Sequence, residues 1–276
     1  MTAIESQPDT EPQATNRPRV IAVGASNLTR FLPCLARVAR GHFDSAVEVV
    51  TALGFGRSYG KSSAFLGREL PGIDQCGLWD ALARDAAQNA AASATAASAR
   101  VERSTGMVMD IGNDIFYDVL PETVVEWVGR AMQKLRPHVQ RLVLAGIPPT
   151  VADIGKVRYA LMRKFLVPSC QMELGEGLRR AAALHEGLRE LARQYDAEFF
   201  EHPYPWFGWD AIHIKRRYWR AFSEALLGVP RSKQRGGVPT LRLRTAAPAW
   251  RQKSGREQVT QQPSVRMRDG STFAIY

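Results

Sequence analysis

Short apolar runs alternate with longer amphipathic segments along most of this chain, and that alternation limits the possible folds more than any other feature. The first run is RVIAVG at residues 19–24, and similar runs begin at residues 47, 105, 139 and 197. Apolar runs of this length that end in glycine or proline are typical of buried strands, and apolar residues spaced three and four apart are typical of helices. Strands that alternate with helices form a parallel sheet with helices on both faces. The sequence therefore predicts an α/β fold, a three-layer α/β/α sandwich around a parallel sheet of about five strands.

The predicted domain spans residues 18–230, with an extension at each end. Residues 1–17 are polar and contain almost no apolar side chain, which predicts a disordered N-terminal extension. Residues 231–276 are rich in Arg, Gln, Gly, Pro and Ser, which predicts a basic, disordered C-terminal tail. Between them we expect a single flavodoxin-like domain, because right-handed crossovers bring all the helices onto one sheet.

The positive charge of the chain belongs mainly to the predicted tail. Ten Lys or Arg and two acidic residues give residues 231–276 a net charge of +8, which leaves +2 of the total +10 for the first 230 residues. A nearly neutral body argues against a nucleic-acid-binding domain, whereas the tail has the charge needed to bind an acidic partner.

Cysteine usage and hydropathy indicate the compartment. Cys34, Cys76 and Cys170 are widely spaced and form no CxxC or Cys/His cluster, which argues against a structural zinc site and favours reduced thiols. The N-terminal residues lack the apolar core of a signal peptide, and no stretch of about 18 apolar residues occurs. We expect a cytoplasmic protein with no membrane span and no metal or cofactor.

Polar or glycine-rich motifs follow three of the predicted strands, and a fourth precedes the last helix. In an open parallel sheet, ligands bind at the carboxyl ends of the strands, so these motifs are expected to meet in one site. The four motifs are Gly24-Ala25-Ser26-Asn27, the turn from Gly54 to Gly60, Gly112-Asn113-Asp114, and Asp210-Ala211-Ile212-His213.

Each motif has a structural use and a chemical one. A serine after a strand is usually a helix cap, but at a helix start it is also placed to act as a nucleophile. An aspartate and a histidine three residues apart, such as Asp210 and His213, share one face of a helical turn, where the carboxylate fixes the imidazole tautomer. The side-chain amide of Asn113 is a suitable donor to an oxyanion. Each motif alone favours the structural use, whereas their order and placement favour a hydrolytic site.

Taken together, the motifs resemble the SGNH hydrolase family, the GDSL-like esterases and lipases, over about residues 19–225. The match departs from the family at its first motif, because the usual Gly-Asp-Ser becomes Gly24-Ala25-Ser26. This change removes an acidic residue before the serine but no member of the family's triad.

The resemblance implies a role for each matched residue. Ser26 corresponds to the nucleophile, and Asp210 with His213 completes the catalytic triad. The oxyanion hole would consist of the backbone of Ser26, a glycine of the glycine-rich turn, best matched by Gly56, and the Asn113 side chain. Which glycine of that turn takes part remains open, with Gly54 as the alternative.

The expected activity is therefore hydrolysis of a carboxylic ester through an acyl-enzyme, without a cofactor or metal. The substrate class extends over small-molecule, lipid and carbohydrate esters. Two alternatives stay open: an acyltransferase that uses the same triad, and a catalytically silent binding protein with a basic tail.

Other motifs in the sequence give weaker support for a phosphate-binding or metal site. Gly60-Lys61-Ser62 follows a strand, but a phosphate-binding P-loop would need glycine where Phe55 stands. The histidines lack the spacing of a metal hydrolase. Near the last motif, four residues either wall a pocket or serve an ordinary surface or packing role: His202, Trp206, Phe207 and Trp209.

Overall fold

A seven-stranded sheet lies at the centre of the protein, in a computed structural model that describes residues 17–65, 67–92, 103–167, 170–230 and 247–276. Its strand order is β10-β11-β2-β1-β5-β6-β7, and all neighbours are parallel except β10 and β11. The strands are β1 (Arg19–Val23), β2 (Glu48–Ala52), β5 (Ser104–Val108), β6 (Arg141–Ala145), β7 (Glu198–Phe200), β10 (Val265–Arg266) and β11 (Thr272–Ile275).

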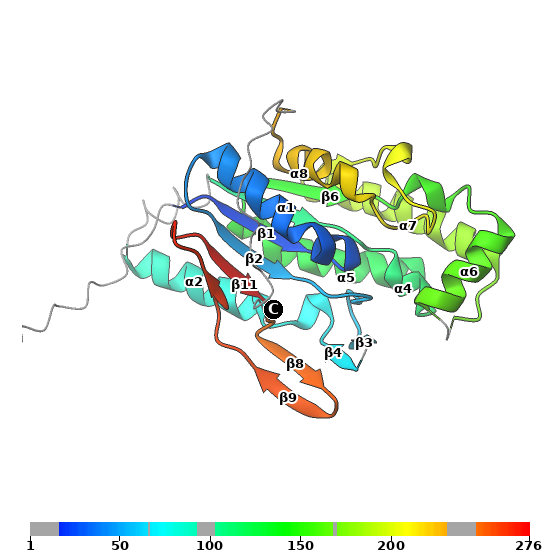
Figure 1. The fold of residues 1–276 in the computed structure, drawn as a ribbon, viewed down its shortest axis with the longest axis horizontal. Coiled ribbons are helices and arrows are strands. Elements are labelled where there is room, and N and C mark those ends of the chain that lie inside the picture. The colour runs from blue at the N-terminus through cyan, green and yellow to red at the C-terminus, as the bar shows by residue number, and fades with distance from the viewer. Residues whose placement is uncertain (1–16, 66, 93–102, 168–169, 231–246) are drawn as a thin grey trace, which may run out of the picture.

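Helices cover both faces of this sheet (Figure 1). One face carries α1 (Ser26–Phe43) and α8 (Trp219–Leu227), and the other carries α2 (Leu78–Ala92), α5 (Pro121–Leu135) and α7 (Leu174–Gln194). The shorter helices are α4 (Asn113–Phe116), α6 (Lys156–Leu166), η1 (Ile73–Gln75), η2 (Arg136–His138), η3 (Pro149–Val151), η4 (Tyr204–Trp206) and η5 (Arg216–Tyr218).

Strand β1 shows how the sequence specifies this layering. All five of its side chains are buried, because β1 lies between β2 and β5 in the middle of the sheet. Val20 and Ala22 pack against the α1 and α8 face, while Ile21 and Val23 pack against the α5 and α7 face. The predicted three-layer α/β fold is confirmed, and all five predicted strands are present as β1, β2, β5, β6 and β7.

The prediction of a disordered tail is wrong for residues 247–276, which contribute strands to two sheets. Strand β11 pairs in parallel with β2 at the edge of the central sheet, and all four of its residues are buried. Phe273 joins the core beneath α1, a burial that stabilises the fold by roughly 1.5–3 kcal/mol. Composition averaged over the tail conceals the three apolar residues Phe273, Ala274 and Ile275, whose strand pairs with one more than 200 residues earlier.

A second, smaller sheet lies beside the first and has the order β3-β4-β8-β9 (Figure 1). It joins β3 (Ser63–Phe65) and β4 (Arg68–Leu70) to β8 (Trp250–Lys253) and β9 (Arg256–Val259), with antiparallel pairing throughout. The domain therefore extends beyond its predicted end at residue 230. The predicted disorder at residues 1–16 and 231–246 lies outside the described residues.

Two further features concern the expectations about membrane spans and cysteines. In the part of the chain that the structure describes, no helix is long and apolar enough to cross a bilayer. Cys34, Cys76 and Cys170 carry free thiols.

Candidate active site

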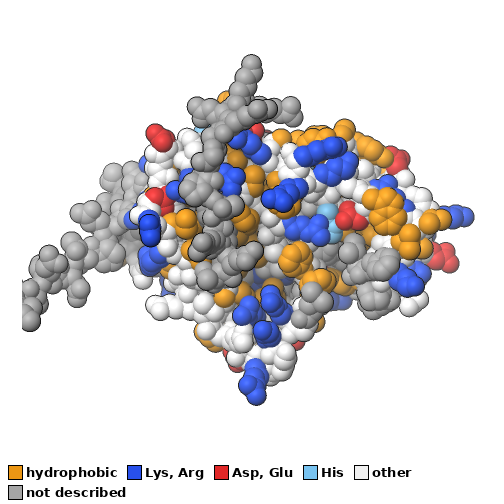
Figure 2. All heavy atoms as spheres, viewed as in Figure 1, with side chains coloured by type: hydrophobic (Ala, Val, Ile, Leu, Met, Phe, Trp, Pro, Cys, Tyr) orange, Lys and Arg blue, Asp and Glu red, His pale blue; other side chains and the backbone are white. Residues whose placement is uncertain are grey.

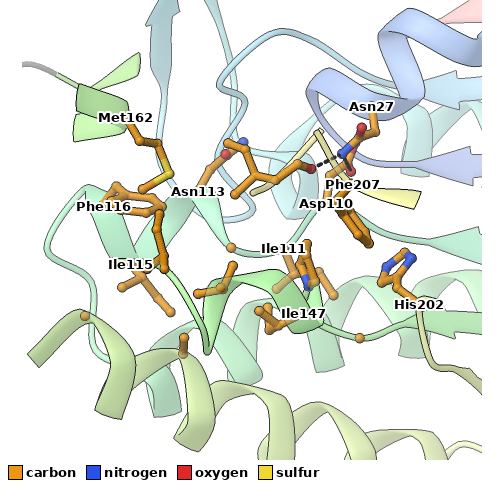
Figure 3. A pocket seen from close by; sticks show the side chains of 18 of the residues that line it. Asn27, Asp110, Ile111, Asn113, Ile115, Phe116, Ile147, Met162, His202 and Phe207 are labelled. Carbon is orange, nitrogen blue, oxygen red and sulfur yellow. Dashed lines mark hydrogen bonds between the residues drawn. The ribbon is translucent and has the colours of Figure 1, made fainter. Parts of the chain in front are cut away.

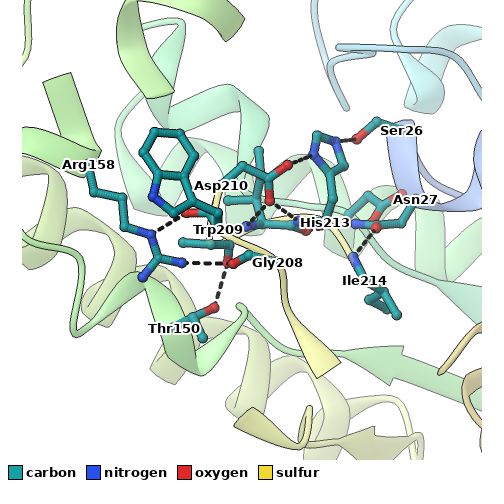
Figure 4. Close-up of polar contacts among 12 residues, drawn as sticks. Ser26, Asn27, Thr150, Arg158, Gly208, Trp209, Asp210, His213 and Ile214 are labelled. Atoms are coloured by element: carbon teal, nitrogen blue, oxygen red, sulfur yellow. Dashed lines mark hydrogen bonds and ion pairs between the residues drawn. The ribbon is translucent and has the colours of Figure 1, made fainter. Parts of the chain in front are cut away.

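The structure brings Ser26, His213 and Asp210 into one hydrogen-bonded chain (Figure 4). Ser26 begins α1 directly after β1, and its Oγ lies 2.9 Å from Nε2 of His213. The other ring nitrogen, Nδ1, lies 2.6 Å from Oδ2 of Asp210. His213 is buried and Ser26 is partly exposed. The serine is therefore accessible from solvent, while the imidazole that it contacts is held inside the protein.

The Asp210 carboxylate is fixed by its own turn. Oδ1 accepts hydrogen bonds from the backbone N–H groups of Ile212 at 3.3 Å and His213 at 3.0 Å. Burial raises the pKa of Asp210, but the bond from the His213 ring, the charge of that ring and the two N–H groups outweigh it. The pKa is therefore lowered, and the carboxylate stays ionised beside the imidazole.

Neighbouring elements hold this turn in place. Thr150 donates through Oγ1 to the carbonyl of Ala211 at 2.6 Å, and Ala211 has a positive φ of 64°. Arg158 of α6 donates to the carbonyls of Gly208 and Trp209 (Figure 4). A strained, non-glycine turn persists only when its surroundings fix it, and these contacts do so.

Asp110, which the sequence analysis did not identify, organises the serine loop. Its Oδ2 accepts from the backbone N–H groups of Ala25 at 3.0 Å and Leu28 at 2.9 Å, and Oδ1 accepts from the Asn27 amide at 2.9 Å. Asp110 also has a positive φ of 60°. The available signal was an aspartate two residues past the end of β5, at the carboxyl end of a central strand.

Asn27 connects the serine loop to the histidine loop. Its side-chain oxygen accepts from the N–H of Ile214 at 2.9 Å, and its Nδ2 donates to the carbonyl of Ile212 at 3.0 Å as well as to Asp110. Ile212 and Ile214 flank His213 in sequence. One buried amide thus sets the distance between Ser26 and His213.

Three candidate oxyanion donors lie around one cleft at Ser26. Gly56 and Asn113 line the same open cleft as Ser26, and Asn113 begins the short helix α4. The N–H of Ser26 belongs to the first turn of α1, where N–H groups have no intrahelical partner. The Asn113 amide makes a 3.4 Å contact with the carbonyl of Arg57.

Of the two glycines left open by the sequence, Gly56 is the one at the cleft. It has a positive φ of 63°, and a Cβ there would meet the Tyr117 hydroxyl at 2.9 Å. Tyr117 donates to the Gly56 carbonyl at 2.5 Å, which restrains the turn directly after the proposed donor. Gly54 is not among the described residues that line the cleft, and a Cβ there would meet the Leu70 side chain of β4 at 2.5 Å.

Asp114 of α4 connects that helix to the glycine-rich turn through hydrogen bonds. It is fully buried and accepts hydrogen bonds from the Ser58 hydroxyl and from the Tyr59 N–H at 3.0 Å. Burial raises the pKa of Asp114 from its ordinary value of 3.8 to about 6. The Ser58 oxygen in turn accepts from the N–H groups of Gly60 and Lys61, which a phosphate-binding loop would leave open.

Ser26 stands between two recesses of different character. One is an apolar pocket enclosed by the ends of β5 and β6 and by α4, α6 and α7, and Figure 3 shows Phe116, Met162 and Ile147 among its walls. The other is the open cleft, lined by Arg30, Phe55, Gly56, Ala64, Phe65, Asn113, Phe116, Tyr117, Met162, Arg163, Val167, Ile212 and His213.

The four residues near the last motif have three different positions: in the pocket wall, in the core and on the surface. His202 and Phe207 line the apolar pocket, whereas Trp206 packs in the core and Trp209 is 61% exposed. Burial lowers the pKa of His202 to about 4, so its ring is neutral and suits an apolar wall. Among the described residues, no group of three His, Cys, Asp or Glu is arranged to hold a metal ion.

No protein-family model matches this chain, and no curated protein matches it. Solved structures do resemble it. LAE5, an α/β hydrolase enzyme from the metagenome of Lake Arreo, is 12% identical, with 78% of this chain and 97% of that chain covered and a TM-score of 0.46. The psychrotrophic esterase EstA from Pseudoalteromonas sp. is 10% identical, with 76% and 94% covered and a TM-score of 0.42. A lipolytic protein of the G-D-S-L family from Veillonella parvula is 12% identical, with 75% and 96% covered and a TM-score of 0.43.

The structures that this chain resembles thus include GDSL-type esterases, at low identity. A fold shared at this identity hosts many activities, so function has to be inferred from the site.

Proposed function

We propose that this protein is a serine hydrolase that cleaves a carboxylic ester through an acyl-enzyme at Ser26. The hydrogen-bonded chain from Ser26 through His213 to Asp210 carries the proposal. A serine hydroxyl becomes a strong nucleophile when a neighbouring base takes its proton and a third group orients that base. All three parts are within hydrogen-bond distance here.

The geometry supports an ordered transfer of one proton. Nε2 of His213 accepts the proton as Oγ of Ser26 attacks the ester carbonyl, and Asp210 stabilises the imidazolium. The imidazolium then protonates the leaving alkoxide, and water repeats the sequence to release the acid. The N–H groups of Ser26 and Gly56 and the amide of Asn113 are the proposed donors to the tetrahedral oxyanion, each worth roughly 3–4 kcal/mol in such sites.

The apolar pocket is the proposed site of the acyl chain. Its lining is dominated by aliphatic and aromatic side chains, with Ser26 at its mouth and Ala181 of α7 on its wall. Each methylene that enters such a pocket contributes ~0.8 kcal/mol, or about fourfold in kcat/KM. We therefore propose esters of apolar acyl chains, and Ala181→Leu is expected to shift the preference toward shorter chains.

Labelling by a fluorophosphonate probe and turnover of p-nitrophenyl esters from acetate to decanoate test the proposal. Wild type is expected to be labelled and to show a maximum of kcat/KM at an intermediate chain length. Ser26→Ala should lose both labelling and turnover, whereas the matched control Ser62→Ala, at an exposed serine, should keep both. A folded wild type that is neither labelled nor active, or a Ser26→Ala that remains active, would contradict the proposal.

A further inference from the structure

The open cleft beside Ser26 contains two arginines that the proposed reaction does not use. Arg30 lies one turn after Ser26 on α1, so the two side chains share a face of that helix. Arg163 comes from α6 on the facing wall of the same cleft. The structure therefore places two cations around the solvent side of the nucleophile.

Neither arginine is neutralised within the described residues. The Arg30 side chain is exposed and makes no hydrogen bond or ion pair there, and the Arg163 side chain makes only one bond, from Nη1 to the carbonyl of Met172 at 3.1 Å. No Asp or Glu occurs among the described residues that line the cleft. In contrast, Arg130 and Arg141, which lie elsewhere, pair with Asp74 and Glu198.

The surface view agrees with this distribution. Figure 2 shows basic side chains gathered over the middle of the face that includes α1, while most acidic side chains on that face lie toward its rim. Unpaired guanidinium groups in a cleft attract anions and can bind carboxylate or phosphate oxygens with two N–H groups at once. The cleft is thus suited to an anionic group on the substrate.

The position of His213 indicates which part of an ester this cleft receives. His213 lines the open cleft and is absent from the described lining of the apolar pocket. Its Nε2 must protonate the leaving oxygen, so the alcohol part of the ester has to lie on the His213 side. The acyl chain then occupies the apolar pocket, and the alcohol part lies between the arginines.

Aromatic rings complete the walls around the alcohol part. Phe55 and Phe65 are 41% and 40% exposed, and their ring centroids lie 5.6 Å apart at the cleft. Two exposed rings beside two cations suit an alcohol that combines an apolar body with an anionic group.

We infer that this protein acts on esters whose alcohol part carries an anionic group, a carboxylate or a phosphate, which Arg30 and Arg163 bind. The inference rests on the proposed function, because it assumes ester cleavage at Ser26. It adds a charge requirement on the alcohol that the triad alone does not impose.

Three butyrate esters with a common ring test the inference: 4-carboxyphenyl, 4-(phosphonooxy)phenyl and neutral 4-carbamoylphenyl butyrate. The measured quantity is the ratio of kcat/KM for each anionic ester to that for the neutral ester. Wild type is expected to favour an anionic ester about tenfold, the size of a charge-assisted hydrogen bond. The preference should shrink as salt is raised from 20 to 500 mM, since exposed charges are screened. A preference confined to one anion identifies carboxylate or phosphate as the group recognised.

Charge variants assign the preference to the two arginines. Arg30→Gln and Arg163→Gln should each reduce the ratio to about threefold and the double variant to about one, whereas Arg30→Lys should restore part of it. The control Arg256→Gln, an exposed arginine on β9, should leave the ratio unchanged. Equal hydrolysis of all three esters, or a ratio unchanged in the double variant, overturns this inference and leaves the proposed function intact. A folded wild type that hydrolyses none of them, turns over no p-nitrophenyl ester and is not labelled by the fluorophosphonate probe overturns both.

Discussion

Two carboxylates near Ser26, those of Asp210 and Asp110, accept similar sets of hydrogen bonds from different parts of the chain. Asp210 accepts two backbone N–H groups and the His213 ring, and Asp110 accepts two backbone N–H groups and the Asn27 amide. The contacts of Asp210 come from residues two and three positions along the chain, whereas those of Asp110 come from residues more than 80 positions away.

The difference between the two lies in what each one orients. Asp210 holds a titratable ring and therefore controls a proton, while Asp110 holds the start of α1 and therefore controls only where the serine stands. Similar hydrogen-bond patterns should thus have different kinetic consequences, which the following predictions examine.

Asp210→Asn is expected to have the largest effect, a loss of about 10³-fold in kcat. The amide cannot stabilise the imidazolium, and the pH profile of turnover should move to lower pH. Steady-state kinetics on a p-nitrophenyl ester from pH 5 to 9 checks this. The control is Asp118→Asn, at an exposed aspartate that pairs with Arg180 and contacts no member of the triad. A variant of Asp210 with nearly full activity would show that His213 needs no carboxylate partner for turnover.

Asp114 is a third carboxylate near the site, and unlike Asp210 its pKa is raised, because burial destabilises its ionised form. Its pKa of about 6, against 3.8 ordinarily, means that the folded chain binds a proton more tightly than the unfolded chain. Its contribution to the free energy of unfolding is therefore full below pH 3.8 and is lost as pH rises to about 6.

The corresponding variant is Asp114→Asn, which does not titrate. Relative to wild type, its free energy of unfolding should rise by about 2 kcal/mol between pH 4 and pH 7. Urea unfolding at pH 4, 5, 6 and 7 measures this difference. A difference that stays constant with pH would show that Asp114 keeps its ordinary pKa in the folded chain.

Asp110→Asn is expected to lower kcat about tenfold and the free energy of unfolding by about 1–3 kcal/mol. Asp110 accepts all three of its bonds, from Ala25, Asn27 and Leu28. The asparagine side chain replaces one accepting oxygen with an NH2 group, which is a donor, so at least one of these bonds is lost. Its pH profile should match wild type, unlike that of Asp210→Asn. A shifted profile would mean that Asp110 also acts on the base and would remove the distinction between the two carboxylates.

Asn27→Ala joined to Asp110→Asn gives the smallest expected effect, a coupling energy of about 1 kcal/mol. Both changes break the same bond between Nδ2 and Oδ1, so their losses should not add. A double-mutant cycle on unfolding free energy and kcat measures the coupling, with Asp118→Asn in place of Asp110→Asn as the uncoupled control. Additive losses would contradict the proposed link between the serine and histidine loops.

The sequence alone determined the central strands and the contact between Asp210 and His213. Strand β1 is readable because the four residues that follow Arg19, from Val20 to Val23, are all aliphatic. The Asp210 and His213 contact is readable because three residues of a turn bring the two side chains together. Both depend on local geometry, which short sequence windows contain.

Only the tertiary structure decided which distant groups meet. Asp110 supports Ser26 because β1 and β5 are neighbours in the sheet, and β11 joins β2 because that edge lacks another partner strand. The same applies to Arg163, which α6 brings to the cleft of Ser26. These contacts follow from strand order and crossover, and no local propensity encodes a partner more than 80 residues away.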